Sequence, residues 1–302
     1  MRIVFMGTPD FAVPSLERLI EDGHEIVAVV TQPDRPQSRG MKMTASPVKE
    51  CAERHNLPVY QPEKIKKDKE FIEKYKEMKP ELAVVVAFGQ ILSKELLDIP
   101  EHGNINVHGS LLPQYRGAAP IQWSVINGDK VTGITTMFMD EGMDTGDMLL
   151  KEVVEIGAEE TAGELFDRLS VLGAEVLSKT ISKLQEGTLT REKQNHSEAT
   201  HVSMINKDLG KLDFTKTSRE LDCLIRGVNP WPGAYFEVNG KKIKVHKARV
   251  CEQTGEAGKI IVADAKKGLI VATKDTSIEL IEIQPEGKRR MTAKEYLIGN
   301  KI

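Results

Sequence analysis

The sequence predicts an α/β fold: a Rossmann-like, mostly parallel sheet with helices on both faces, followed by a small C-terminal β-barrel of the OB-like type. In the first two thirds of the chain, short apolar runs alternate with helical patterns, which favours right-handed crossovers and a parallel sheet. This alternation stops near residue 188, and after residue 208 short strands follow one another. We therefore predict a first domain at residues 1–189, a linker at 190–207 and a second domain at 208–302.

Apolar runs mark the strands of the first domain. Arg2–Met6 opens the chain, and Glu25–Thr31 and Leu82–Ala87 are apolar and rich in β-branched residues, as strands covered on both faces are. A long helix is expected at Glu160–Glu186, where leucines recur at helical spacing. The other strands are expected at Asn104–His108, Gly133–Met139 and Met148–Glu155, and the other helices at Phe11–Asp22, Pro47–His55, Lys67–Met78 and Pro120–Asn127.

The second domain is expected to be mostly β. A helix at Ser218–Arg226 precedes a series of short alternating segments, and Asn239-Gly240 between two of them is a hairpin turn signal. Such short strands suggest a small barrel, a fold that often binds nucleic acid. The strands are expected at Ala234–Val238, Lys242–Arg249, Gly258–Ala263, Leu269–Ala272 and Ser277–Gln284.

Composition narrows the class of protein. Apolar residues make up 40% and charged residues 29% of the 302-residue chain, as is usual for soluble globular proteins. No apolar run approaches the roughly 20 residues that a membrane span needs, and the run before Gly7 is too short for a signal peptide. The three cysteines make no CxxC pair, so we expect a reducing, cytoplasmic setting with neither a disulfide framework nor a zinc site.

Charge is distributed unevenly along the chain. From Asp208 onward there are 18 Lys and Arg and 13 Asp and Glu, which gives a net charge of +5. The remainder has 24 Lys and Arg and 32 Asp and Glu, a net charge of −8. A basic C-terminal third fits a polyanionic partner, although charge alone is equally compatible with a solvated surface.

The turn after the first strand argues against a dinucleotide cofactor. Gly7-Thr8-Pro9-Asp10 has a single glycine, whereas a dinucleotide fingerprint needs G-x-G-x-x-G at this place.

Asn106 and His108 are the first candidates for chemistry. They lie in the string NINVHGSLLPQYRG at Asn104–Gly117, which begins as a strand and ends in a loop. Residues 106 and 108 share one face of that strand, at the end where ligands bind in open α/β sheets. An amide and an imidazole suit a reaction in which a carbonyl becomes tetrahedral, since Asn can donate to the oxyanion and His can move a proton. The alternative is that both merely satisfy backbone groups.

An acidic loop supplies the third candidate. Asp140–Asp147 reads DEGMDTGD, but the twelve-residue pattern of a calcium loop is absent. Asp140 and Glu141 fit a surface turn. Asp144 is the better candidate for a half-buried carboxylate that orients or charges His108.

These motifs resemble those of a known family. HGSLLP after Asn106, followed by Gly117, resembles the signature of the 10-formyltetrahydrofolate-dependent formyltransferases, and GMDTGD resembles the segment that carries their catalytic aspartate. The resemblance implies that Asn106, His108 and Asp144 are catalytic and that 10-formyltetrahydrofolate is the co-substrate. It implies no metal. It also implies that the folate lies against Ser110, Leu111, Leu112 and Pro113.

The accepting amine is suggested by a long basic loop. Thr31–Lys49 exceeds the length of ordinary connections and carries Arg35, Arg39, Lys42 and Lys49. It resembles the insertion by which methionyl-tRNA formyltransferases reach the acceptor end of initiator tRNA. A solvated loop is the alternative.

The second domain supports the same family. NPWPG at Asn229–Gly233 and the basic strand Lys241–Arg249 resemble that family's second domain, so the resemblance runs nearly end to end. It implies formyl transfer to the amino group of methionyl-initiator-tRNA. We expect a monomer without a membrane partner. We expect the tRNA contacts to come from Arg35, Arg39, Lys42, Lys241 and Lys244.

Two other readings remain open. A formyltransferase acting on an amino sugar nucleotide would share the trio and a similar second domain. A non-enzymatic RNA-binding protein would explain the barrel and its charge but would leave Asn106, His108 and Asp144 without a role.

Overall fold

The computed structural model describes residues 1–37 and 42–302, and the side chains of Gln37 and Lys42 are not described. The chain forms two compact units that interleave along the sequence. The first comprises Met1–Gly117, Gly133–Val154 and Phe166–His201, and the second comprises Ala118–Thr132, Glu155–Leu165 and Val202–Ile302. The domain boundaries predicted at residues 189 and 207 divide the chain into consecutive segments, whereas these units interleave. Those boundaries therefore stay a prediction.

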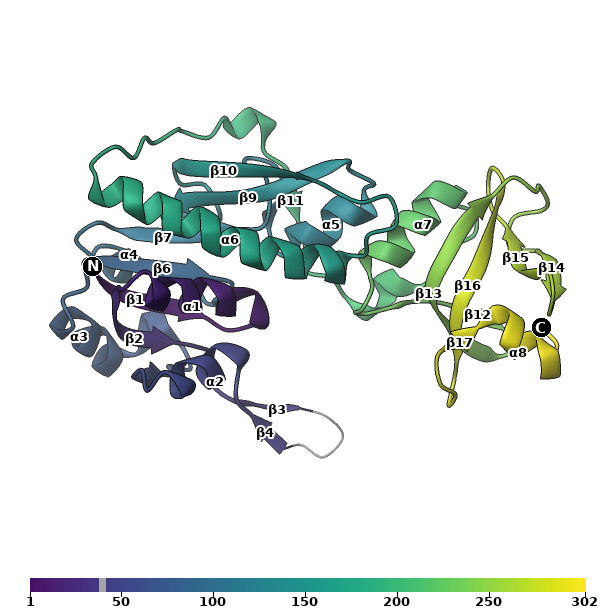
Figure 1. The fold of residues 1–302 in the computed structure, drawn as a ribbon, viewed down its shortest axis with the longest axis horizontal. Coiled ribbons are helices and arrows are strands. Elements are labelled where there is room, and N and C mark those ends of the chain that lie inside the picture. Colours follow the sequence, from purple (N-terminus) through teal and green to yellow (C-terminus); the bar gives the residue numbers. More distant parts are fainter. Residues whose placement is uncertain (38–41) are drawn as a thin grey trace. The chain divides into compact units, whose positions relative to one another are not determined.

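The first unit is built on a seven-stranded sheet in the order β10-β9-β7-β6-β1-β2-β5 (Figure 1). Parallel pairs join β1 to β2 and β6, β6 to β7, and β2 to β5, whereas β7 and β9 are antiparallel. The predicted mostly parallel sheet is therefore confirmed. Its strands are β1 (Arg2–Gly7), β2 (Glu25–Val30), β5 (Val59–Tyr60), β6 (Leu82–Val86), β7 (Asn104–His108), β9 (Val131–Phe138) and β10 (Met148–Glu155).

Helices cover both faces of this sheet. On one face Phe71, Tyr75 and Leu96, from α3 (Lys69–Glu77) and α4 (Lys94–Leu97), pack on Val4 and Val85. On the opposite face, the helix that carries Gly173 runs close over β7. A Cβ added at Gly173 would lie only 3.1 Å from Val107 Cγ1. The helices are completed by α1 (Val13–Glu21), α2 (Pro47–Arg54) and that long helix, α6 (Ala162–Gln185), with the 3₁₀ turns η1 (Asp10–Ala12), η2 (Ile65–Lys67) and η3 (His196–Glu198).

Two segments expected to be irregular contain short strands. Within Thr31–Lys49, β3 (Arg35–Gln37) pairs antiparallel with β4 (Lys42–Thr44). In the segment predicted as a linker, β11 (His201–Val202) pairs with β8 (Arg116–Gly117). Both pairs are shorter than the window over which a period can be recognised, which explains why the sequence pattern does not show them.

The second unit contains an antiparallel sheet in the order β12-β13-β16-β15-β14, with β17 on β16. The pairings form an open path, and no pair that would close a barrel is found among the described residues. Its elements are α5 (Pro120–Ile126), η4 (Lys207–Gly210), α7 (Ser218–Gly227), β12 (Ala234–Val238), β13 (Lys241–Cys251), β14 (Ile260–Asp264), β15 (Gly268–Ala272), β16 (Ser277–Pro285), β17 (Met291–Thr292) and α8 (Ala293–Gly299).

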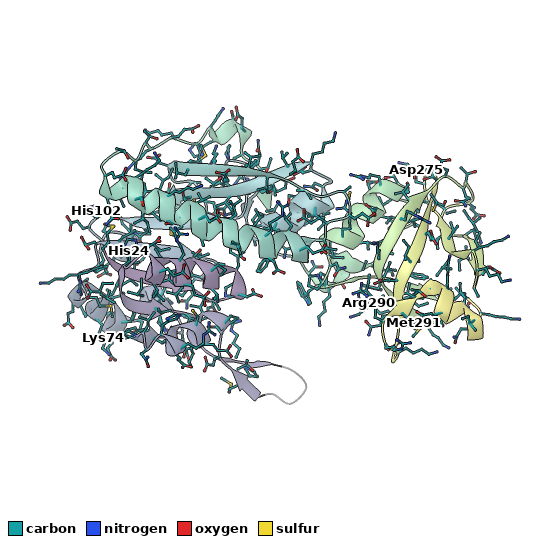
Figure 2. The ribbon with its side chains drawn as sticks, viewed as in Figure 1. His24, Lys74, His102, Asp275, Arg290 and Met291 are labelled. Atoms are coloured by element: carbon teal, nitrogen blue, oxygen red, sulfur yellow. The ribbon has the colours of Figure 1, made fainter. Side chains whose placement is uncertain are left out.

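Helix caps fix where the helices of this unit start. Thr217 and Thr292 each form a reciprocal capping box with a glutamate three residues later. Asp275, in the turn between β15 and β16, accepts the backbone N–H of Ser218 at the start of α7 at 2.8 Å (Figure 2). In the described part of the chain, no helix has both the length and the apolar character required to cross a bilayer.

Candidate active site

Strand β7 presents Asn106 and His108 on the same face of the sheet. Its neighbour Val107 faces α6, so alternation turns residues 106 and 108 the other way. Through its backbone, Asn106 pairs with Val85 of β6 and Met137 of β9. Its side chain is half-buried and makes no hydrogen bond within the described residues. The Asn106 amide therefore has donor and acceptor capacity left for a ligand.

The ring of His108 is fixed through one nitrogen. His108 is only 6% exposed, and its Nε2 lies 2.9 Å from the carbonyl oxygen of Tyr115. Because a carbonyl oxygen can only accept, this contact assigns the hydrogen to Nε2. The other ring nitrogen, Nδ1, is then the atom that can take up a proton.

Asp144 lies on the Nδ1 side of this ring. Its Oδ2 is 3.9 Å from His108 Nδ1, which is close enough for charge interaction but longer than a hydrogen bond. The same oxygen accepts the backbone N–H of Gly117 at 2.7 Å. The structure therefore brings Asp144 and His108 together as the sequence predicts, and Asp144 faces the nitrogen that Tyr115 leaves available.

Gln194 fixes the position of the Asp144 loop, although the sequence pattern does not indicate it as a site residue. Its Nε2 donates to the carbonyl oxygens of Asp144 and Gly146, both at 2.8 Å, and its Oε1 accepts from the buried Arg116 guanidinium at 2.7 and 3.1 Å. Asp144 has a left-handed backbone (φ 56°), which Asp and Asn adopt more readily than other residues with a Cβ but which still gains from the hydrogen bonds that Gln194 supplies. Nothing in the polar stretch around Gln194 signals this role, because its partners lie far away in sequence.

We expect Gln194→Leu to lower kcat for the reaction proposed below on the order of 10-fold, because a loosened Asp144 loop misplaces the carboxylate. The free energy of unfolding should fall by about 2–3 kcal/mol, since two carbonyls and a buried guanidinium lose partners. Steady-state kinetics and thermal unfolding measure the two effects. Gln194→Glu keeps an acceptor for Arg116 but lacks the donors to the loop, so it should lower kcat as well and isolates the effect of those two hydrogen bonds. Unchanged kcat in both variants would contradict the positioning role.

The turn at residues 110–113 is held mainly by the protein itself. Ser110 Oγ donates to the Gln114 carbonyl at 2.7 Å, and the Leu112 N–H donates to Thr135 Oγ1 at 3.1 Å. Leu112 packs with two methionines and Pro113 is also buried, whereas Leu111 is half-buried. Of the four predicted folate contacts, Leu111 and the backbone of the turn are thus the parts most available to a ligand.

A cavity of about 470 Å³ lies at the carboxyl ends of β1, β2 and β6. The strand order reverses between β1 and β6, which is where open α/β sheets bind ligands. Thr8 Oγ1 and Gln32 Nε2 both donate to the carbonyl oxygen of Phe88, at 2.9 and 3.3 Å, and thereby join the three strand ends. The loop at Ala87–Gly89 lines this cavity and directly follows the strand that pairs with Asn106, so it is a candidate site segment that sequence reasoning did not include.

Comparison with known protein families identifies the family of this chain. A family model described as "Formyl transferase" matches residues 1–181, and one described as "Formyl transferase, C-terminal domain" matches residues 204–301. The chain belongs to the formyl transferase family. The predicted family is thereby confirmed.

Relatives match this formyl transferase from end to end. It is 54% identical to "Methionyl-tRNA formyltransferase" of Alkaliphilus oremlandii, covering 100% of this chain and 97% of the relative, and 53% identical to that of Clostridioides difficile, covering 100% and 98%. A solved N-formyltransferase from Helicobacter canadensis, in complex with folinic acid and dTDP-3-aminofucose, superimposes with a TM-score of 0.71 at 21% identity, covering 93% of this chain and 98% of the other. At that identity the likeness concerns the fold alone.

In this formyl transferase the basic loop is anchored at its base. Lys49 Nζ donates to Asp34 Oδ2 at 2.6 Å and to Gln61 at 3.0 Å. Gln61 also donates to Asp34, and the hydrogen bonds from Lys49 and Gln61 hold the pKa of the Asp34 carboxyl below its usual value. Lys49 therefore braces the loop, although the sequence groups it with the other basic residues. Arg35 is exposed and donates to Gln32 at 2.6 Å. Arg39 and the side chain of Lys42 lie outside the described residues.

Only some basic residues of the second unit are available to an anion. Lys247 pairs with Glu159, and Arg249 with Glu279. Lys241 and Lys244 are exposed on β13, and neither makes an ion pair with any residue that the structure describes. They are therefore better candidates for phosphate contacts than their paired neighbours.

Proposed function

We propose that this formyl transferase moves the formyl group of 10-formyltetrahydrofolate to the free amino group of methionyl-initiator-tRNA, which prepares that tRNA for translation initiation. Relatives at 50% identity or more over the whole chain, all called methionyl-tRNA formyltransferase, support this substrate. The convergence of an amide, an imidazole and a carboxylate at the end of β7 carries the chemical part of the proposal. Solved sugar formyltransferases share only about 20% identity, so they do not favour a sugar substrate.

The proposed reaction needs one proton to move. The amine nitrogen attacks the formyl carbon, the new C–N bond forms, and the carbonyl oxygen becomes an oxyanion. Asn106 donates a hydrogen bond to that oxygen, and an N–H aimed at a developing oxyanion is worth roughly 10²–10³ in rate. When the intermediate collapses, the bond from the formyl carbon to the folate nitrogen breaks, and that nitrogen receives the proton lost by the amine.

His108 is proposed to carry this proton on Nδ1. Its Nε2 is held by Tyr115, so Nδ1 can take the proton from the amine and return it to the folate nitrogen. Asp144, 3.9 Å away, stabilises the positive ring while it holds the proton. No step of this sequence requires a metal.

The remaining assignments follow from the same proposal. The folate lies against Leu111 and the backbone of the 110–113 turn. All residues invoked in the chemistry belong to one chain, so a monomer suffices, and a charged tRNA together with a soluble folate implies a cytoplasmic reaction. Arg35, Arg39, Lys42, Lys241 and Lys244 bind the tRNA, with residues 208–302 as the tRNA-binding domain.

A direct assay tests this function. The full chain is incubated with 10-formyltetrahydrofolate and either initiator or elongator methionyl-tRNA, and formyl-methionine is measured after hydrolysis of the ester. We expect transfer to initiator methionyl-tRNA, with elongator methionyl-tRNA a poorer substrate. An amino sugar nucleotide is the control amine, and faster transfer to it would replace the proposed substrate.

We expect the double variant Lys241→Ala/Lys244→Ala to raise KM for tRNA about 10-fold and leave kcat almost unchanged. Two lost phosphate contacts should also reduce the slope of log Kd against log salt by about 2. Lys247→Ala, which removes a lysine already paired with Glu159, is the control. Equal effects of the control and the double variant would show that the distinction between free and paired lysines is wrong.

A further inference from the structure

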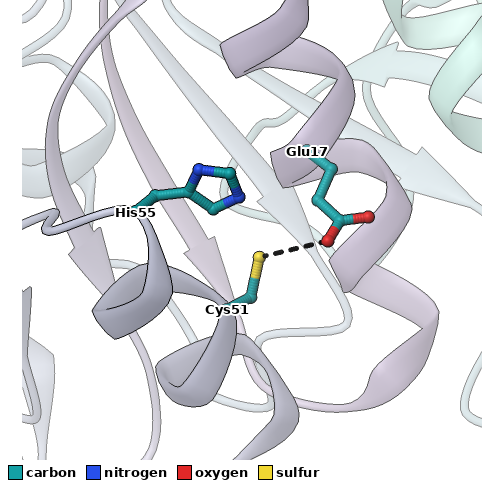
Figure 3. A group of neighbouring side chains, drawn as sticks. All are labelled: Glu17, Cys51 and His55. Atoms are coloured by element: carbon teal, nitrogen blue, oxygen red, sulfur yellow. Dashed lines mark hydrogen bonds between the residues drawn. The ribbon is translucent and has the colours of Figure 1, made fainter.

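Three potential metal ligands meet on the outside of the first unit. Glu17 comes from α1, Cys51 from α2, and His55 directly follows α2 as its C-cap (Figure 3). The ring of His55 and the carboxylate of Glu17 both point toward the sulfur of Cys51 (Figure 3). Their ligand atoms all lie within 4.8 Å of one another, and Cys51 Sγ lies 3.8 Å from Glu17 Oε1.

The local structure explains why these groups converge. Cys51 and His55 are four residues apart, so both side chains lie on the same face of the helix. Cys51 is fully buried, whereas His55 is exposed and has room to change its rotamer. A thiolate and a carboxylate bound to one tetrahedral zinc ion lie about 3.5 Å apart, from bonds of about 2.3 and 2.0 Å. Small side-chain rotations would therefore bring all three ligands into range.

We propose that Glu17, Cys51 and His55 form a zinc-binding site that joins α1 to α2. One sulfur, one imidazole nitrogen and one carboxylate oxygen are ligands that Zn²⁺ accepts, and a water completes the tetrahedron. From the sequence no zinc site is expected because the cysteines form no CxxC pair. That criterion cannot detect this cluster, because it uses a single cysteine and draws Glu17 from a different helix.

The site differs from the proposed catalytic site and serves a structural purpose. The cavity at the ends of β1, β2 and β6 is lined by Ser46 and Pro47 at the start of α2 and by Thr8–Asp10, just ahead of α1. A zinc ion shared by both helices fixes their mutual position and so steadies the two segments that line this cavity. The ion should bind whether or not the protein catalyses formyl transfer.

Arg54 is the natural competitor of the metal. Its guanidinium lies 3.2 Å from Glu17 Oε1, and the side chains of Arg54 and Glu17 are 60% and 42% exposed, so the ion pair is weak and can exchange for a metal. Removing this guanidinium should therefore strengthen zinc binding, whereas removing a ligand should weaken it. Arg54→Gln should tighten zinc binding by about 2- to 5-fold, the equivalent of an exposed ion pair.

The test uses the full chain, stripped with a chelator and titrated with Zn²⁺ in a calorimeter and with Co²⁺ in a spectrophotometer. We expect one ion per chain, a thiolate-to-cobalt charge-transfer band, and a melting temperature that rises with Zn²⁺ concentration. His55→Ala and Glu17→Gln change exposed or half-exposed residues and should keep the fold. Each should weaken binding by about 100-fold or more, beyond what loss of an outer partner costs. Cys51→Ala should abolish the charge-transfer band.

Matched controls separate this site from casual binding. Cys251→Ser and His102→Ala replace a cysteine and a histidine outside the cluster, and both should bind zinc like the parent chain. Equal affinity in the parent, His55→Ala and Glu17→Gln would overturn the proposal. A charge-transfer band that persists in Cys51→Ala would do the same. Because binding and melting are measured without folate or tRNA, failure here leaves the proposed function untouched, and failure of the formylation assay leaves this site untouched.

Discussion

Asn106→Ala is expected to lower kcat for formyl transfer by about 10²–10³-fold, the cost of removing one donor to an oxyanion. The Asn106 amide makes no hydrogen bond to any described residue, so its removal leaves no protein group without a partner. KM for tRNA and the melting temperature should therefore hardly change. Single-turnover kinetics with saturating tRNA, and a separate binding titration, distinguish loss of chemistry from loss of binding.

Two further variants sharpen this test. Asn106→Asp has the same shape but places a negative charge beside the oxyanion, so it should be slower than Asn106→Ala. Asn104→Ala is the matched control, because Asn104 begins the same strand on the same face and donates to the Leu97 carbonyl at 2.7 Å. Asn104→Ala should lower the melting temperature and leave kcat unchanged. Parallel loss of kcat and tRNA affinity in Asn106→Ala would mean that Asn106 acts in tRNA binding, and would contradict its role as a donor to the oxyanion.

Regular elements could be predicted because their signal is local. Leu82–Ala87 reads as a buried strand from its own residues, and β6 occupies Leu82–Val86 with every residue buried. Asn106 and His108 could be placed together because alternation along a strand is a rule of covalent geometry. The acidic loop already makes Asp144 a candidate partner of His108, but its catalytic role is implied only by the resemblance, since nothing local in DEGMDTGD fixes where that loop folds back.

The missed features depend on contacts that the local sequence pattern does not show. Gln194 acts through backbone carbonyls some 50 residues away, and Tyr115 acts through its own carbonyl, which no side-chain pattern reveals. Lys49 counts as one of the loop's positive charges in the sequence, yet Asp34 and Gln61 bind it. In each case the residue type permits the contact, and only the tertiary structure selects the partner.

Asp144→Asn is expected to lower kcat by about 10² or more, on the scale of a general acid–base group. The substitution isolates charge from structure. An asparagine oxygen in the position of Oδ2 can still accept the Gly117 N–H, and asparagine tolerates the left-handed backbone that residue 144 adopts. What disappears is the negative charge 3.9 Å from His108 Nδ1, and with it the stabilisation of a protonated ring.

Comparison with Asp144→Ala separates the two roles of this carboxylate. Alanine removes the charge, the acceptor for Gly117 and the tolerance for a positive φ, so its free energy of unfolding should fall by about 1–2 kcal/mol. Asparagine should unfold near the parent temperature with an unchanged KM. If the charge matters, both variants lose kcat to a similar extent despite their different stabilities. A near-normal kcat in Asp144→Asn, with a loss confined to Asp144→Ala, would mean that Asp144 only shapes the loop and that His108 carries its proton without help.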